Sequence, residues 1–173
     1  MVETARYRVR QFFRALTAQV SDEELEQVAH VLTPASLTLF RSMTVQDQRH
    51  ALAVCHTLRR AGHTDPRLFA AALLHDVGKA AARLPVWQRA VIVLLERFAP
   101  RLLTCLSQGK PQGWRRSFVV HARHPEIGAR WAEEAGCSPL AVALIRRHQE
   151  RPGDRRTEQD KFLAALQAAD DLN

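Results

Sequence analysis

The chain has 173 residues, of which 46% are hydrophobic, so it can form one domain with a buried core but not two domains of ordinary size. Its three widely spaced cysteines exclude a zinc knuckle and a disulfide framework, and its longest apolar run, residues 90–95, is too short to span a membrane. The net charge of +7 comes from residues 83–130, where nine basic residues outnumber two acidic ones. Since no apolar signal-peptide core follows the first arginines, we expect a soluble, cytoplasmic protein.

Helical periodicity runs through almost the whole chain, and no segment alternates in the manner of a β-strand. The expected helices cover, in chain order, residues 3–19, 21–32, 34–43, 45–60, 66–78, 85–109 with an interruption at 100, 115–122, 125–135, 138–149 and 157–171. Local signals support several of the starts: Ser21 and Glu24 form a capping box, and Thr33 precedes a proline at the third helix. The sequence therefore predicts a single all-α domain, folded as a helical bundle.

The helix expected at 85–109 is more apolar than one core-facing side requires, and Trp87 and Trp114 flank it. This composition indicates a central core helix or a dimer contact. Because Arg89, Arg97 and Arg101 are interspersed among its apolar residues, a role at a membrane surface is the alternative.

Several of the expected helices place a histidine or an aspartate where an apolar face ends. These residues are His50, His75 with Asp76, His124, His148 and Asp170. A buried carboxylate costs several kcal/mol unless it is paired or bound to a metal, so Asp76 requires a partner. Helical bundles build internal metal sites from side chains delivered in this way. Imidazole and carboxylate ligands together suit Mn, Fe, Co, Ni or Zn, with Mg possible.

The ordered set His50, His75-Asp76 and Asp170 resembles the H…HD…D motif of the HD-domain metal-dependent phosphohydrolases, which are all-α bundles. The stretches "HDVGK" at 75–79, "HPEIGA" at 124–129 and "RRHQE" at 146–150 are similar to the branch that includes the cyclic-dinucleotide phosphodiesterases. The resemblance covers residues 45–173, which it implies to be an HD-type metal-binding domain. Residues 1–44 lie outside it and are expected to form an N-terminal helical extension packed on the core.

The resemblance also implies a ligand set for one or two divalent ions. One ion would be held by His50, His75, Asp76 and Asp170, and a second would share Asp76 and add His124 and His148. The chain has Arg147 where relatives with two ions often have a further histidine, so the number of ions stays open. It also lacks the G-Y-P signature, which argues against a cyclic di-guanylate phosphodiesterase.

By the same resemblance the protein would be a metal-dependent phosphohydrolase that cleaves a phosphomonoester or phosphodiester, expected to be a nucleotide, with a metal-bound hydroxide. Asp76 and Lys79 are the expected catalytic residues, and Lys79 and Arg147 the expected substrate ligands. Lys79 is equally explained as a helix-capping lysine, and Arg147 as the ion-pair partner of an acid such as Glu150. His121 and Asp171 remain alternatives to His124 and Asp170.

Two other classes of function remain open. A regulatory or interaction module of HD type would keep the metal site with little activity. A nucleic-acid-binding protein would use the basic stretch 83–130, although the few aromatic residues there do not favour base stacking. The expected partner is a small phosphorylated substrate, and a homodimer is also compatible with the sequence.

Overall fold

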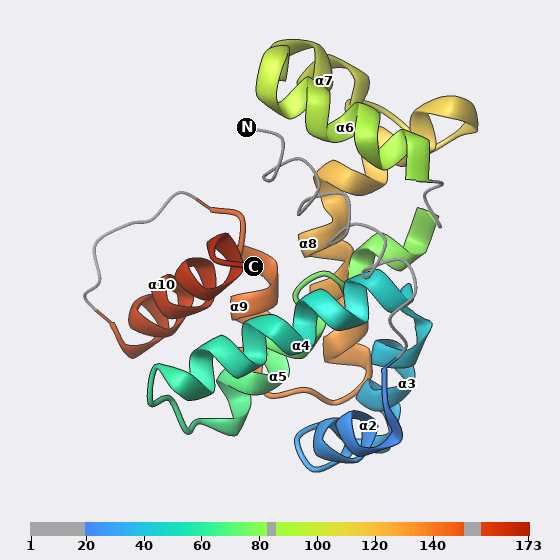
Figure 1. Ribbon diagram of the computed structural model, residues 1–173. Coiled ribbons are helices and arrows are strands. Elements are labelled where there is room, and N and C mark those ends of the chain that lie inside the picture. The colour runs from blue at the N-terminus through green and yellow to red at the C-terminus, as the bar shows by residue number, and fades with distance from the viewer. Residues whose placement is uncertain (1–19, 83–85, 151–156) are drawn as a thin grey trace, which may run out of the picture.

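The computed structural model describes residues 20–82, 86–150 and 157–173, and within these ranges the chain is entirely helical, as predicted (Figure 1). The expected helix at 3–19 lies outside the described residues. The elements are, in chain order, α2 (Asp22–Ala29), α3 (Pro34–Ser42), α4 (Val45–Arg60), α5 (Pro66–Leu74), the 3-10 helix η1 (Val77–Ala82), α6 (Val86–Phe98), α7 (Pro100–Leu106), the 3-10 turn η2 (Gly113–Arg115), α8 (Arg116–Glu134), α9 (Pro139–Arg147) and α10 (Glu158–Asp171).

The helices begin directly after the polar residues from which their starts were predicted. The Ser21 side chain accepts a hydrogen bond from the amide of Glu24, whose carboxylate accepts one from the Ser21 amide, so the predicted capping box is confirmed. The Thr33 side chain accepts a hydrogen bond from the amide of Ser36 and caps α3, and the Asp65 side chain accepts one from the amide of Arg67 and caps α5. Each cap gives a partner to amides that have none within the first helical turn.

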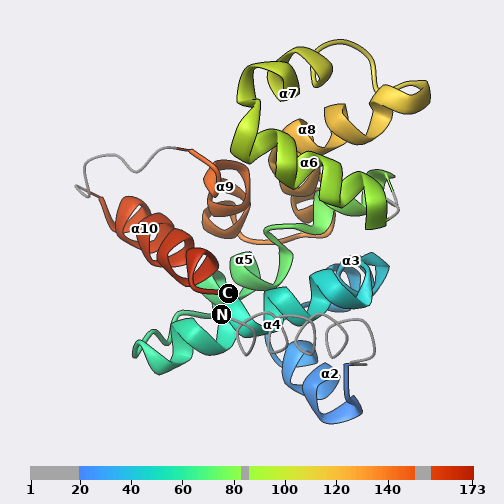
Figure 2. The same ribbon diagram turned by 45° about the horizontal axis from the view of Figure 1, so that its top comes forward.

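One hydrophobic core joins helices from both ends of the chain. Its largest buried side chains are Val28, Phe40, Val54, Leu58, Leu68, Leu73, Leu74, Leu144, Ile145 and Leu166. Helix α5 lies near the middle of this core, in contact with α4 and α9, and α10 closes it against α4 (Figures 1 and 2). Helices α2 and α3 share the same core, because Val28 and Phe40 are among its members.

The predicted break between residues 122 and 125 is wrong, since α8 runs without interruption from Arg116 to Glu134. Pro125 lies inside this helix, so His124 is in its middle and not at its start. Proline has no amide hydrogen and cannot bond to the carbonyl four residues earlier, which belongs to His121. The helix continues because that carbonyl has a different donor, as described below.

The fifth helix is shorter than predicted. It ends at Leu74, with His75 as its C-cap, and the chain continues into η1 instead of extending α5 to Gly78. At Gly78 the backbone of η1 passes so close to α8 that a Cβ atom would overlap the carbonyl oxygen of His124 and lie 2.8 Å from the amide nitrogen of Gly128. The absence of a side chain at Gly78 therefore lets η1, which follows His75 and Asp76, lie directly against α8 at His124.

The apolar segment expected in the central core forms a separate layer instead. Pro100 begins α7, so the segment is divided into α6 and α7, which contact one another. Ile92 of α6 packs on Phe118 of α8 in a small second cluster, apart from the main core. Val93, Leu94, Phe98 and Leu102 remain exposed, so the expectation of a core helix is wrong for this face. None of the described helices is both long enough and apolar enough to cross a membrane.

Candidate metal centre

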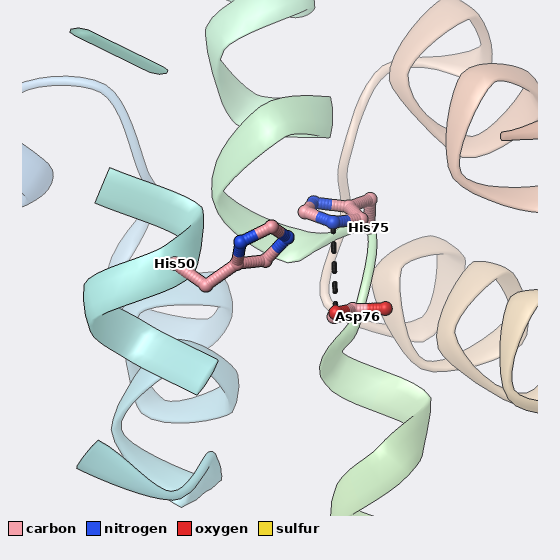
Figure 3. Close-up of side chains that lie close together, drawn as sticks. All are labelled: His50, His75 and Asp76. Carbon is pink, nitrogen blue, oxygen red and sulfur yellow. Dashed lines mark ion pairs between the residues drawn. The ribbon is translucent and has the colours of Figure 1, made fainter. Parts of the chain in front are cut away.

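Side chains from four helices converge where α5 passes into η1. His50 comes from α4, His75 and Asp76 from the end of α5, His124 from α8 and His148 from the end of α9. They form two groups, His50 with His75 and Asp76, and Asp76 with His124 and His148, and within each group the potential ligand atoms lie within 4.8 Å of one another. Figure 3 shows the first group, with His50 reaching from α4 toward His75. Asp76 belongs to both groups.

The second group is almost fully buried. Oδ1 of Asp76 lies 3.2 Å from Nε2 of His124 and 3.9 Å from Nε2 of His148. The two imidazole Nε2 atoms are themselves 3.2 Å apart. The three side chains are at most 5% exposed, so water contributes little to solvating them.

The first group is completed by α10. The other Asp76 oxygen, Oδ2, lies 3.6 Å from Nε2 of His75. Oδ1 of Asp170 lies 2.8 Å from Nε2 of His50 and 3.5 Å from Nε2 of His75. Asp171 is exposed, so Asp170 is the acid of this helix that reaches the centre.

Three of the histidines are oriented by the same kind of hydrogen bond, which runs from Nδ1 of the ring to a backbone carbonyl. Nδ1 of His75 donates to the carbonyl of Ala72, and Nδ1 of His148 donates to the carbonyl of Ile145. Both acceptors lie in the last turn of a helix, where carbonyls have no amide partner. Nδ1 of His124 donates to the carbonyl of His121 at 2.5 Å, the acceptor that Pro125 leaves free.

This pattern fixes the orientation of the three rings. Because Nδ1 of each ring is bonded to a backbone carbonyl, Nε2 is the nitrogen that faces the carboxylate of Asp76. The Nε2 atoms of His124 and His148 also face each other at 3.2 Å, so both are within reach of a cation held beside Asp76. Nε2 of His75 is buried without a hydrogen-bond partner among the described residues. Metal-binding histidines usually have this backbone hydrogen bond on the nitrogen away from the ion, so the residues fit a divalent metal.

The ionisation states of the acids also suit a cation. Burial raises the pKa of Asp76, but the charge of His75, a hydrogen bond from His124 and the charge of Lys79 together hold it well below its usual value. Burial likewise opposes ionisation of Asp170, and its contacts with His50 and His75 lower its pKa. Both carboxylates are therefore negatively charged at neutral pH.

The buried histidines differ from one another. Burial lowers the pKa of His148 to about 3, with smaller contributions from the charges of His75 and His124, so His148 is neutral at physiological pH. Burial also disfavours the charged form of His75, but the charges of Asp76 and Asp170 outweigh it and raise the pKa of that ring. A proton and a metal ion would therefore compete for Nε2 of His75.

Lys79 and Arg147, the two residues predicted to bind the substrate, lie in different surroundings. Nζ of Lys79 lies 2.5 Å from Oδ2 of Asp76, so this ammonium is part of the centre. Arg147 instead forms ion pairs with Glu150, at 2.8 Å, and with Asp160, at 3.3 Å. These contacts support the ion-pair interpretation of Arg147 over substrate binding.

A groove beside the centre was not predicted from the sequence. It has a volume of about 400 Å³ and is lined by Leu103, Thr104, Ser107, Gln108, His121, Ala122 and Gln149. His121 connects it to the centre, because its ring centroid lies 5.9 Å from that of His124. Oγ of Ser107 is buried without a hydrogen-bond partner among the described residues. The only sequence signal for this groove was that Gln149 directly follows His148 and that Ala122 lies two residues before His124.

The arrangement as a whole is a buried cluster of imidazoles around charged carboxylates, with an ammonium and an open groove next to it. Such a cluster can bind one or two divalent cations that share Asp76. Comparison of the chain with protein-family models, with curated proteins and with solved structures finds no match. The chemistry of the site rests on its own geometry.

Proposed function

We propose that this protein is a metal-dependent phosphohydrolase of HD type that cleaves a phosphomonoester or phosphodiester, with a nucleotide as the expected substrate. The observation that supports this most directly is the position of Asp76, whose two carboxylate oxygens are directed at different groups of histidines. A carboxylate in this position is suited to bridging two cations, and a pair of bridged cations is a common arrangement in enzymes that hydrolyse phosphate esters.

In this proposal His50, His75 and Asp170 would hold one ion, and His124 and His148 the other. Divalent metal ions supply Lewis acidity, which makes water available as a nucleophile near neutral pH. The backbone hydrogen bonds on Nδ1 keep the histidine rings from rotating, so the ligand atoms are oriented before any ion binds. Burial of the cluster strengthens each electrostatic interaction within it.

Lys79 would act on the substrate. Its ammonium already contacts the carboxylate of Asp76, while its side chain remains 26% exposed and accessible from solvent. A phosphoryl oxygen placed beside Asp76 would accept a hydrogen bond from Lys79. Negative charge that develops on the phosphoryl oxygens in the transition state would be stabilised by this ammonium.

The groove next to His121 would bind the remainder of the substrate. Apart from the imidazole of His121, its polar side chains are uncharged hydroxyls and amides, those of Thr104, Ser107, Gln108 and Gln149. Such groups can donate and accept hydrogen bonds, as a sugar or a nucleobase requires. The groove therefore favours a phosphate ester with a polar organic group over inorganic polyphosphate.

The test is a panel of phosphomonoesters and phosphodiesters, including nucleotides, assayed with Mn²⁺, Ni²⁺, Co²⁺, Zn²⁺ or Mg²⁺. We expect hydrolysis that falls by about a hundredfold or more in Asp76→Asn and in His50→Ala. His56→Ala is the matched control, because His56 lies on the same helix as His50 but is exposed, and it should keep full activity. Metal binding without hydrolysis of any ester would instead identify a regulatory module.

A further inference from the structure

The exposed apolar side chains of this protein are concentrated in one region. Of the eight large apolar residues that are exposed among the described ones, six lie between residues 87 and 114. They are Trp87, Val93, Leu94, Phe98, Leu102 and Trp114. Trp87 is 65% exposed and Phe98 is 78% exposed, which is unusual for side chains of this size. We refer to these six residues as the α6–α7 surface.

Helix α6 has two apolar faces, and only one of them packs against other described residues. Ile92 and Leu95 pack toward Phe118 in the small second cluster. Trp87, Leu94 and Phe98 lie seven and four residues apart, which places them along one line on a neighbouring side of the helix. Helices α6 and α7 lie together at one end of the molecule, away from α2 and α10, in both views (Figures 1 and 2).

The same region is strongly basic. Between residues 86 and 116 the sequence has basic residues at 89, 97, 101, 110, 115 and 116, and an acidic residue only at 96. Arg97, Arg101, Lys110 and Arg116 are exposed. The guanidinium of Arg97 lies 5.9 Å from the centroid of the Phe98 ring, so basic and apolar groups are interspersed on this surface.

The positive charge of the α6–α7 region determines which kind of partner can bind there. A second copy of the chain packed on the same surface would bring two sets of arginines together, which costs free energy unless anions intervene. An anionic bilayer satisfies both features, since its headgroups pair with the arginines while aromatic and apolar side chains enter the interfacial region. Tryptophan and arginine are the residues expected where a protein meets lipid headgroups.

We propose that the α6–α7 surface binds the surface of an anionic lipid bilayer, so that the protein is a peripheral membrane protein. Trp87, Leu94 and Phe98 insert between the headgroups, and Arg97 and Arg101 pair with lipid phosphates. The binding is peripheral because no described helix can cross a bilayer. This proposal does not depend on the metal centre, since none of these residues belongs to it.

The test is sedimentation of the full-length protein with vesicles of phosphatidylcholine alone or mixed with phosphatidylglycerol. We expect binding only to the anionic vesicles, and weaker binding at high salt. The double variant Trp87→Ser/Phe98→Ser should reduce binding at least tenfold. The variant Arg97→Gln/Arg101→Gln should reduce it by a similar factor, since each basic residue near a charged bilayer contributes about fivefold.

Two matched control variants distinguish binding through the α6–α7 surface from nonspecific binding of the protein to vesicles. Val45→Ser/Leu172→Ser removes exposed apolar side chains elsewhere, and Arg59→Gln/Arg60→Gln removes exposed charges at the end of α4. Both should bind vesicles as the unchanged protein does, with circular dichroism confirming that every variant is folded. The proposal is overturned if anionic vesicles do not bind the protein, or if the α6–α7 variants bind them unchanged. It is also overturned if light scattering finds a dimer that Trp87→Ser/Phe98→Ser dissociates, because the surface would then be occupied by a second copy.

Discussion

Nδ1 of His124 donates a hydrogen bond to the backbone carbonyl of His121 at 2.5 Å, within a single uninterrupted helix. In a regular helix this carbonyl would accept from the amide of residue 125, but Pro125 has no amide hydrogen. The proline therefore supplies a free acceptor for a candidate metal ligand. As a result Nε2 of His124 faces Asp76, with 3.2 Å between Nε2 and Oδ1.

The variant Pro125→Ala tests this relationship. An alanine amide would compete with His124 for the His121 carbonyl and release the ring from its fixed orientation. We expect the affinity of the His124 side of the centre for Mn²⁺ to fall by about tenfold to a hundredfold, the usual effect of losing such a partner. The melting temperature should rise, because proline inside a helix costs about 3 kcal/mol. Metal titration and thermal unfolding measure the two effects.

Pro139→Ala is the control for this experiment. Pro139 is at the first position of α9, where a helix amide has no intrahelical acceptor, so the amide introduced by its replacement competes for no carbonyl near the centre. It should leave the affinity for Mn²⁺ unchanged. Equal affinities for Pro125→Ala and the unchanged protein would show that the proline does not orient His124.

The ligand residues could be predicted because they are polar at positions where the rest of their helix is apolar. A histidine or aspartate at the buried end of an apolar run, as at His75 and Asp76, is unfavourable unless something compensates it. The structure brings these residues together with His50, His124 and His148. The choice of Asp170 over Asp171 also follows, since the former continues the buried face that includes Ala169.

Other features depended on packing that a sequence pattern does not contain. Pro125 signalled a helix end, but a side chain replaced the missing hydrogen bond and the helix continued. The apolar residues of α6 and α7 indicated a core helix, but hydrophobicity alone does not distinguish a buried face from one reserved for a partner. The groove beside His121 combines residues from α7, α8 and α9, and only the fold brings these together.

Gly78 is predicted to be indispensable because η1 and α8 pass each other there. In Gly78→Ala the new methyl group would overlap the His124 carbonyl, and both sides of the contact are backbone, which cannot rotate away. We expect a loss of about 3 kcal/mol or more in the free energy of unfolding, at the upper end of overpacking effects. Gly128→Ala is the matched variant, since its Cβ would lie 3.2 Å from the nearest atoms, and it should cost less. Urea denaturation measures both, and equal losses would contradict this account.

Binding of a divalent ion should stabilise the folded protein through Asp76. A ligand that binds only the folded state at a hundred times its dissociation constant adds about 2.7 kcal/mol to the free energy of unfolding. We expect Mn²⁺ to raise the melting temperature of the chelator-treated protein and of the exposed-histidine variant His56→Ala. Asp76→Asn should abolish the increase, because it removes the carboxylate common to both groups of ligands. An increase of the same size in Asp76→Asn would rule out this residue as a shared ligand.

The low pKa of His148 predicts how stability changes with pH. Burial lowers this pKa to about 3 in the folded protein, whereas an unfolded histidine titrates at about 6.5. Between these values the unfolded chain binds a proton that the folded protein does not, so stability is present at higher pH and is lost as the pH falls. In chelator-treated protein, His148 should contribute a decrease of up to about 1.4 kcal/mol per pH unit below about pH 6. Urea unfolding between about pH 6.5 and about pH 5 measures it, because the lowered pKa values of Asp76 and Asp170 act mainly below this range. The free energy of unfolding of His148→Gln should depend less steeply on pH than that of the unchanged protein. The control His56→Gln, on the exposed side of α4, should show the same pH dependence as the unchanged protein. Parallel curves for all three proteins would mean that His148 is not held neutral by its surroundings.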